Sequence, residues 1–294
     1  MRITSYVRLL RPEQWLKNVF VLLPVFFGGK LLDIDCWSRV LPSFIAFSLM
    51  ASAVYCFNDV RDVEADRRHP KKCRRPVASG EVSVPAAITI MVLLSVAAAV
   101  IPVLSLGDSG WLISAIIVGY FALNIVYCLK LKYYAIIDVF VISTGFVLRL
   151  LCGGLSTGIY LSPWIVLMTF LLALFLAFAK RRDDVVMYER QGLVTRKNIV
   201  SYNIPFMNQT LGLIGTIAIV CYIIYTVQPD VVERLGSQYV YLTSLFVVAA
   251  ILRYLQVAIV RADSGSPTKI LIRDRFIQAC LLGWGVSFMI ILYL

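Results

Sequence analysis

The feature that most constrains the fold is a succession of long runs with few or no charged side chains. Lipid offers no hydrogen bonds to the backbone, so a spanning segment must be a helix of about 20 residues or a closed barrel. The runs are long enough for helices, and we predict an all-α, polytopic membrane protein. Nine spans are predicted, roughly at 17–32, 40–57, 84–106, 111–129, 134–155, 159–179, 204–228, 236–258 and 275–293.

The first of these runs is the weakest. Pro24, Gly28 and Gly29 interrupt it, and Lys30 shortens it, so a tilted or broken helix is expected there. Composition supports the membrane class as a whole. Hydrophobic residues make up 60% of the chain and charged residues 15%, against about 45–50% and about 25% in soluble proteins.

The distribution of Lys and Arg predicts the orientation in the membrane. With nine spans, 23 of the 28 basic residues fall on one side, which the positive-inside rule makes cytoplasmic. The C-terminus would then lie outside, whereas a count of eight spans would put both termini on the same side. Anionic lipid headgroups explain part of this basic face. No nucleic acid is expected as a partner, because no soluble groove interleaves aromatic and basic residues.

The Cys and His content excludes several kinds of site. His69 is the only histidine, so a catalytic triad with histidine and a His-rich metal site are both excluded. The seven cysteines are scattered without a Cys-x-x-Cys pair, so neither a zinc site nor a disulfide framework is predicted. With no linker or low-complexity segment, we predict one integral-membrane domain over residues 1–294.

A concentration of acids follows the second predicted span. If the helix continues, Asp59, Asp62 and Asp66 lie on one face of it, and Asn58, Asp62 and Asp66 form a neighbouring stripe. Such carboxylates repel one another unless a cation lies between them, and hard oxygen ligands suit Mg²⁺. The alternative is a solvated charged helix end, which is what most charge runs are.

A second charged segment follows the sixth predicted span. Extended as a helix, it places Lys180, Asp183 and Asp184 on one face, with Arg181 beside them. Taken alone this could be a stop-transfer cluster, but both acidic segments follow even-numbered spans and therefore reach the same membrane face. We predict that they form one site.

Other polar residues occur inside or at the ends of spans. Asp138 and Arg149 lie in the fifth span, three turns apart, and charges there normally face a cavity or a partner. Tyr127 lies near Lys130 at the cytoplasmic end of the fourth span.

Together these motifs resemble the UbiA-type intramembrane prenyltransferase superfamily, whose first signature, Asn-Asp-x-x-Asp-x-x-x-Asp, is matched at 58–66. Within it the chain looks most like the decaprenyl-phosphate phosphoribosyltransferases. The stretches that carry this resemblance are 11–18, 59–76, 124–132 with Asp138, 145–149, 180–181, 266–269 and 274–275. The second acidic motif departs from the superfamily pattern, because Asp183 and Asp184 are adjacent and preceded by Lys180 and Arg181.

The resemblance implies nine helices around a central cavity that opens to the cytoplasmic side of the inner (plasma) membrane. It also implies transfer of 5-phosphoribosyl from phosphoribosyl diphosphate to a polyprenyl (decaprenyl-type) phosphate, with Mg²⁺ as cofactor. Expected metal ligands are Asn58, Asp59, Asp62, Asp66 and Asp183. Expected catalytic residues are Asp59, Asp62, Asp66, Lys180 and Asp184. Expected substrate-binding residues are Lys17, Asn18, Arg74, Arg75, Tyr127, Lys130, Arg149 and Arg181.

Two other functions stay open at this stage. One is UbiA-type prenyl transfer from a prenyl diphosphate to an aromatic or other small acceptor. The other is a transporter. Paired, interrupted spans at the depth of the bilayer midplane would indicate a transporter, whereas here the acids lie together at the cytoplasmic boundary of the membrane. The sequence leaves open whether the chain forms a homo-oligomer.

Overall fold

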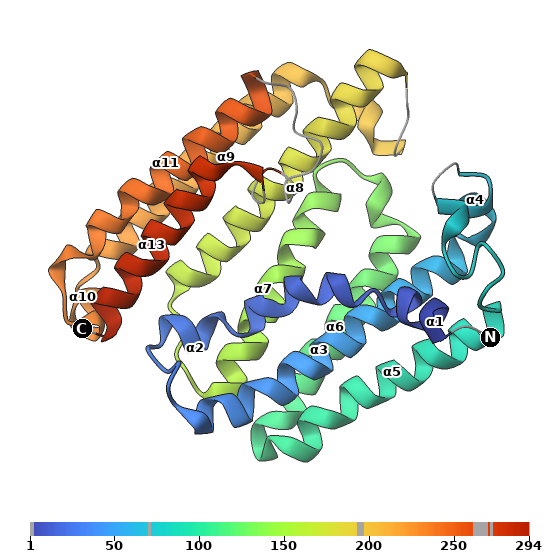
Figure 1. The fold of residues 1–294 in the computed structure, drawn as a ribbon, viewed down its shortest axis with the longest axis horizontal. Coiled ribbons are helices and arrows are strands. Elements are labelled where there is room, and N and C mark those ends of the chain that lie inside the picture. Colours follow the sequence, from blue (N-terminus) through green and yellow to red (C-terminus); the bar gives the residue numbers. More distant parts are fainter. Residues whose placement is uncertain (1–2, 70–71, 193–196, 261–269, 271–272, 294) are drawn as a thin grey trace. The chain divides into compact units, whose positions relative to one another are not determined.

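The computed structural model describes residues 3–69, 72–192, 197–260, 270 and 273–293. This part of the chain is helical and contains no strand (Figure 1). It divides into two compact units, residues 1–131 with 145–161 and residues 132–144 with 162–294. The boundary falls within one helix, α7 (Ile137–Thr157). That the chain forms a single domain stays a prediction.

The first unit contains most of the N-terminal half. Besides the later part of α7, its elements are α1 (Ile3–Leu10), η1 (Pro12–Val21), α2 (Leu23–Phe27), α3 (Ile34–Arg61), α4 (Val63–Arg67), η2 (Lys72–Arg74), α5 (Val84–Ser105), η3 (Gly107–Ser109) and α6 (Gly110–Leu129).

Helix α3 is the central helix of this unit. It packs along α5 and also contacts α6 and η1 (Figure 1). In its most apolar stretch 61% of the residues are buried, against 17% in α5. A helix that is apolar on every side is buried in the protein or faces lipid. Helix α3 is buried in the protein, and α5 faces lipid. Helix α3 is therefore the element that can hold polar groups away from lipid.

The segment predicted as the first span is broken, as its Pro and Gly residues indicated. Residues 12–21 form the 3₁₀-helix η1, and a short α-helix, α2, follows. A 3₁₀ run of this length is uncommon and needs tertiary support. Part of the support comes from α7, where a Cβ on Gly153 would lie 1.8 Å from the Val21 carbonyl oxygen. Only glycine permits this close approach of η1 to α7.

The second unit contains the start of α7 and the C-terminal half. Its other elements are η4 (Leu131–Tyr133), which begins at the unit boundary, α8 (Pro163–Gln191), η5 (Lys197–Ser201), α9 (Ile204–Val227), α10 (Pro229–Leu235), η6 (Gln238–Thr243), α11 (Ser244–Leu255), the π-helix η7 (Gln256–Val260) and α13 (Arg275–Tyr293).

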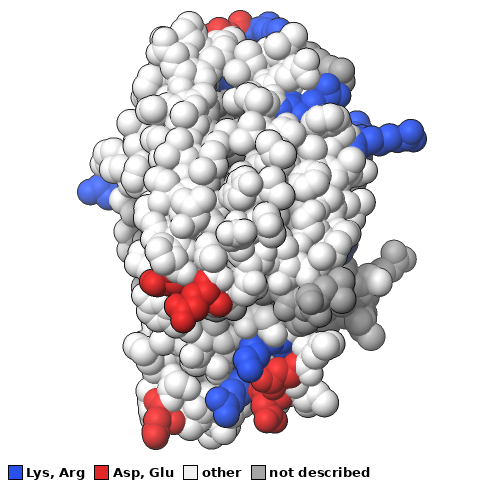
Figure 2. Space-filling view, turned by 90° about the vertical axis from the view of Figure 1, so that its left-hand side faces the viewer, with Lys and Arg blue, Asp and Glu red and all other residues white. Residues whose placement is uncertain are grey.

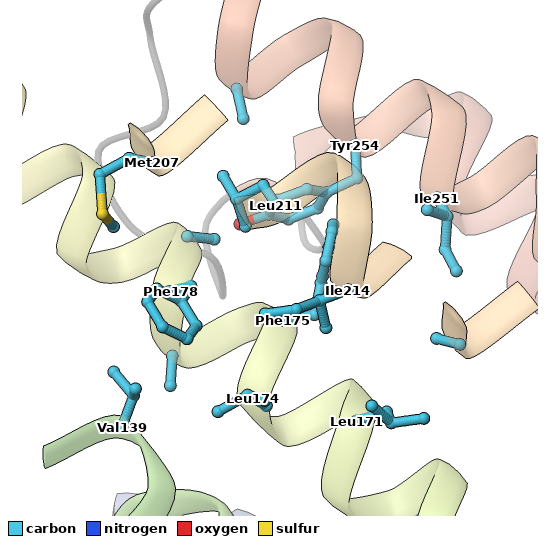
Figure 3. Close-up of a cluster of buried hydrophobic side chains, with 14 of the residues drawn as sticks. Val139, Leu171, Leu174, Phe175, Phe178, Met207, Leu211, Ile214, Ile251 and Tyr254 are labelled. Atoms are coloured by element: carbon cyan, nitrogen blue, oxygen red, sulfur yellow. The ribbon is translucent and has the colours of Figure 1, made fainter. Parts of the chain in front are cut away.

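The core of the second unit lies between α8, α9 and α11 (Figure 3). Phe175 and Phe178 of α8 contribute to it together with Leu211 of α9 and Tyr254 of α11. Local sequence fixes where α8 runs. The Ser162 side chain caps its first turn, and Gly192 ends it in a left-handed conformation. The charged segment 180–190 is therefore the last part of this one helix.

Within the part of the chain that the structure describes, seven helices are long and apolar enough to cross a membrane, and α13 is a shorter apolar helix. All but the first of the predicted spans coincide with these eight. The prediction of nine spanning helices is not confirmed, because η1 and α2 are too short. Figure 2 shows one face on which uncharged residues dominate and charged residues form small groups. The chain is an integral membrane protein.

Candidate functional site

The acid motif lies where α3 ends and α4 begins. Helix α3 ends at Arg61, and α4 starts at Val63. The backbone nevertheless stays on a helical path, because Asp62 N donates to Asn58 O (2.9 Å) and Asp66 N donates to Asp62 O (2.8 Å). The predicted continuation of the helix through the motif is thus confirmed, with a change of element at Asp62.

Two of the motif carboxylates are buried against two arginines. The side chains of Asp59 and Asp66 are 1% and 4% exposed. Arg11 donates to Asp59 Oδ1 at 2.6 Å, and Arg75 Nη1 bridges Asp59 Oδ1 (3.3 Å) and Asp66 Oδ2 (2.7 Å). Both arginines are more exposed than the carboxylates they contact. Their charge balances that of two carboxylates that would be costly to bury alone.

The predicted metal ligands fit a hard cation in chemistry. The described residues contain no group of three or more His, Cys, Asp or Glu placed to hold one metal ion. Even so, Asp59 Oδ2 is buried and has no hydrogen-bond partner, a vacancy that a cation could fill. Asn58 Oδ1 accepts a hydrogen bond from Cys128 Sγ (2.7 Å), which orients its amide. Asp62 is half-buried.

The other predicted contacts of the first unit divide by exposure. Lys17, Arg74 and Lys130 are exposed, and Tyr127 is half-buried. Their positions neither confirm nor exclude phosphate binding. Of the stretches that resemble the family, residues 70, 71 and 266–269 lie outside the described part of the chain.

Arg149 and Asn18 are engaged inside the first unit. Arg149 Nε donates to Asn18 Oδ1 (2.7 Å), Nη1 to the Gly145 carbonyl (2.7 Å) and Nη2 to Tyr120 OH (3.0 Å). The guanidinium also lies 4.8 Å from the ring centroids of Phe47 and Tyr120. It thereby holds η1 against α7, and this contact is a structural role for both predicted residues.

The second unit holds a buried ion pair that joins the start of α7 to the end of α8. Arg181 Nε donates to Asp138 Oδ2 (2.5 Å), and Arg181 Nη1 donates to Asp184 Oδ2 (3.1 Å). Their side chains are 1%, 0% and 16% exposed for Arg181, Asp138 and Asp184. Arg181 was predicted to bind substrate. The structure places its guanidinium between two carboxylates, where it orients the more exposed Asp184, and its role in substrate binding stays a prediction.

The structure separates the two adjacent aspartates. Lys180 is exposed and Asp184 half-buried, whereas Asp183 is buried within electrostatic range of Tyr254. The predicted helical extension that places Lys180, Asp183 and Asp184 on one face is confirmed, but the three side chains differ in exposure. On the same inner side, Arg182 Nε donates to Asn208 Oδ1 (2.6 Å) and Arg182 Nη1 to the Ala258 carbonyl (2.6 Å).

Sequence reasoning missed the partners of these buried charges. Arg11 was noted only within a resembling stretch, and Asp138 only as an intramembrane charge without a partner. Each pairs with a residue more than 40 positions away. The one available signal was physical, because an acid inside a membrane span needs a cation.

Comparison with known families agrees with this arrangement. The model of the UbiA prenyltransferase family matches residues 21–278, most of the chain. The chain belongs to the UbiA prenyltransferase family. UbiA membership confirms the resemblance seen in the acid motif, and it covers both units.

Relatives and solved structures are consistent with UbiA membership. A decaprenyl-phosphate phosphoribosyltransferase of Mycobacterium tuberculosis is 36% identical over 96% of this chain and 92% of its own length. One of Corynebacterium glutamicum is 31% identical over 98% and 86%. A UbiA homologue of Archaeoglobus fulgidus, solved with DMAPP and Mg²⁺, has a TM-score of 0.69 at 18% identity over 97% of this chain and 99% of that one. This last likeness concerns the fold.

The Asp138–Arg181 pair gives a first prediction. Arg181→Met should lower the free energy of unfolding by about 3–5 kcal/mol, because it leaves a buried carboxylate without its cation. Adding Asp138→Asn should recover more than half of the loss, since the second change removes the buried charge. Unfolding in mixed micelles titrated with a denaturing detergent measures both. A double variant no more stable than Arg181→Met would contradict the pairing.

Proposed function

We propose that this chain transfers the 5-phosphoribosyl group of phosphoribosyl diphosphate to a polyprenyl phosphate of the decaprenyl type and releases diphosphate. The observation that carries the proposal is the similarity, at 31–36% identity over nearly the whole chain, to relatives named decaprenyl-phosphate phosphoribosyltransferase. Shorter local similarity would support only the family. Here both acidic segments lie inside the aligned length.

The first unit supplies the proposed diphosphate site. Asn58, Asp59, Asp62 and Asp66 would hold Mg²⁺, which neutralises charge on the leaving diphosphate. A solved UbiA homologue binds Mg²⁺ together with a prenyl diphosphate. Arg11 and Arg75 already contact the carboxylates, and their exposed sides are available to phosphate oxygens. Arg74, Lys17 and Lys130 are proposed as further phosphate contacts, with Tyr127 beside them.

The second unit supports a ribosyl donor over a prenyl donor. Of its two adjacent aspartates, Asp184 is partly exposed and lies next to the exposed Lys180, while Asp183 is buried. We propose that Lys180 binds the 5-phosphate, a group that prenyl diphosphates lack. Asp184, which Arg181 holds in place, would then contact either the metal or the ribose. Asp183, predicted as a metal ligand, is the less accessible candidate.

The reaction needs positioning and charge stabilisation more than acid–base chemistry. An oxygen of the lipid phosphate attacks C1 of the ribose while the bond from C1 to the diphosphate oxygen breaks, and the electron pair leaves with diphosphate. Because the attacking phosphate is already ionised, no base has to remove a proton. The transition state has oxocarbenium character and is stabilised by held charges. A single histidine, His69, outside the buried clusters is consistent with this.

The basic loops support a location for the site. In the nine-span sorting, 23 of the 28 Lys and Arg residues fall on the side that both acid segments reach, so we propose that the site faces the cytoplasm from the inner (plasma) membrane. The lipid acceptor would then enter from the cytoplasmic leaflet.

Product analysis tests the proposed reaction. Purified protein with Mg²⁺ should convert labelled phosphoribosyl diphosphate and decaprenyl phosphate into a labelled lipid that contains ribose 5-phosphate. Parallel reactions receive geranylgeranyl diphosphate with 4-hydroxybenzoate. Prenylated benzoate in place of the ribosyl lipid would contradict the proposal and favour prenyl transfer. Asp62→Asn serves as the inactive control, with expression unchanged.

The donor assignment makes a separate prediction about binding. Lys180→Ala should weaken binding of phosphoribosyl diphosphate about 10- to 150-fold, the effect of losing one charge-assisted hydrogen bond. Binding of free diphosphate should change little, because only the donor has a second, remote phosphate. Calorimetric titration of both ligands at fixed Mg²⁺ measures this.

The matched control is Lys30→Ala, which removes another exposed lysine, one that pairs with Asp33 just before the start of α3. It should leave both affinities unchanged. If Lys180→Ala lowers the affinity for both ligands equally, Lys180 binds the diphosphate, and the assignment of a ribosyl donor would be withdrawn.

A further inference from the structure

The turn that leads into α7 contains a strained residue. Ile136 has φ 65, in the left-handed region, where β-branched side chains are rarely found. In the described residues only Arg11 shares this feature among non-glycine residues. Such conformations persist when surrounding contacts hold them, and they cluster at functional sites.

Tyr202 supplies the contact that holds this turn from outside. Ile136 N donates to the Tyr202 phenol oxygen at 2.5 Å, while Ile137 N donates to the Ala135 carbonyl within the turn itself (2.7 Å). The phenol belongs to the segment between η5 and α9, 66 positions away. Burial raises the pKa of Tyr202, so the phenol stays neutral and its oxygen remains an acceptor.

The Tyr202 ring is itself fixed. It is 7% exposed and belongs to the core of the second unit. Phe206 stacks on it with ring centroids 6.0 Å apart, and Phe178 meets it edge-on at 6.5 Å. The phenol oxygen is therefore a rigid point to which the turn is attached.

The turn at Ile136 also determines the position of Asp138, which lies only two residues later in the first turn of α7. Asp138 accepts from Arg181, and Arg181 also donates to Asp184. Asp138 Oδ1 makes no hydrogen bond, so the carboxylate is oriented by Arg181 and by the backbone that carries it. A shift of the turn would move all three charges.

We propose that Tyr202 is a positioning residue, whose phenol oxygen keeps Ile136 in the left-handed conformation and so fixes Asp138, Arg181 and Asp184 for binding the donor. The inference deepens the proposed function and rests on it for its kinetic part. Tyr202 itself touches no reacting atom. The alternative is that its hydroxyl adds only to overall stability.

A double-variant experiment separates these two roles. Tyr202→Phe keeps the ring and removes the acceptor, and it should lower kcat/KM for phosphoribosyl diphosphate about 3- to 10-fold, the effect of one lost neutral hydrogen bond. Ile136→Gly should be close to wild type, because glycine adopts the left-handed conformation without strain. Combining Ile136→Gly with Tyr202→Phe should restore kcat/KM, since the turn no longer needs its tether.

The matched control is Tyr222→Phe. Tyr222 is equally buried and hydrogen-bonds Thr243 and Trp284, but it lies near the far end of α9. This variant should melt at a lower temperature with kcat/KM unchanged. A Tyr202→Phe variant with wild-type kcat/KM, or a double variant that recovers nothing, overturns the proposal. If Tyr202→Phe does not fold, recovery of folded, active protein in the double variant supports it and failure to recover overturns it.

Amide hydrogen exchange provides a readout that does not depend on the reaction. Exchange at residues 136–139 should accelerate in Tyr202→Phe, and protection at 138–139 should return in the double variant. Unchanged exchange overturns the positioning role. If the wild-type protein forms no ribosyl lipid but the variants show this exchange pattern, the proposed function is overturned, while the role of Tyr202 in holding the turn is supported.

Discussion

Two arginines lie against two buried carboxylates at the end of α3, and this pairing balances the buried charge of the acid motif. Asp59 and Asp66 are almost fully covered, so each needs a cation at hydrogen-bond distance. Arg11 and Arg75 provide it from the more accessible side. A bound Mg²⁺ would neutralise the two carboxylates, and Arg11 and Arg75 would then be able to bind phosphate oxygens of the same ligand.

The second unit meets the same constraint in a different way. Arg181 lies between Asp138 and Asp184 and is almost completely buried. Arg181 thus orients a carboxylate, and the proposed ligand contact is the neighbouring exposed Lys180. The adjacent aspartates Asp183 and Asp184 differ in burial, so of the two only Asp184 is partly exposed at this end of α8.

The sequence predicted the helices well because hydropathy depends on local composition. Eight of the nine predicted spans correspond to helices, and the acid motif indicated the family that the comparison confirmed. The segment 17–32 differs because Asn18 is tied by Arg149 and η1 approaches Gly153 closely, contacts that only the folded chain reveals. The same holds for Arg11 with Asp59 and for Tyr202 with Ile136, whose partners are distant in sequence. Exposure, which separates Lys180 from Arg181, could not be read from spacing alone.

Metal affinity in the absence of donor tests the central pairing most directly. Mn²⁺ binding, followed by electron paramagnetic resonance, is compared in the wild type and in Arg75→Gln. If Arg75 neutralises Asp59 and Asp66, its removal should tighten binding of free Mn²⁺ by about tenfold or more, the effect of removing one nearby positive charge. Phosphoribosyl diphosphate should tighten Mn²⁺ binding strongly in the wild type. Equal Mn²⁺ affinities of the two proteins without donor would contradict the account. So would a wild type that, without donor, binds Mn²⁺ more tightly than Arg75→Gln does.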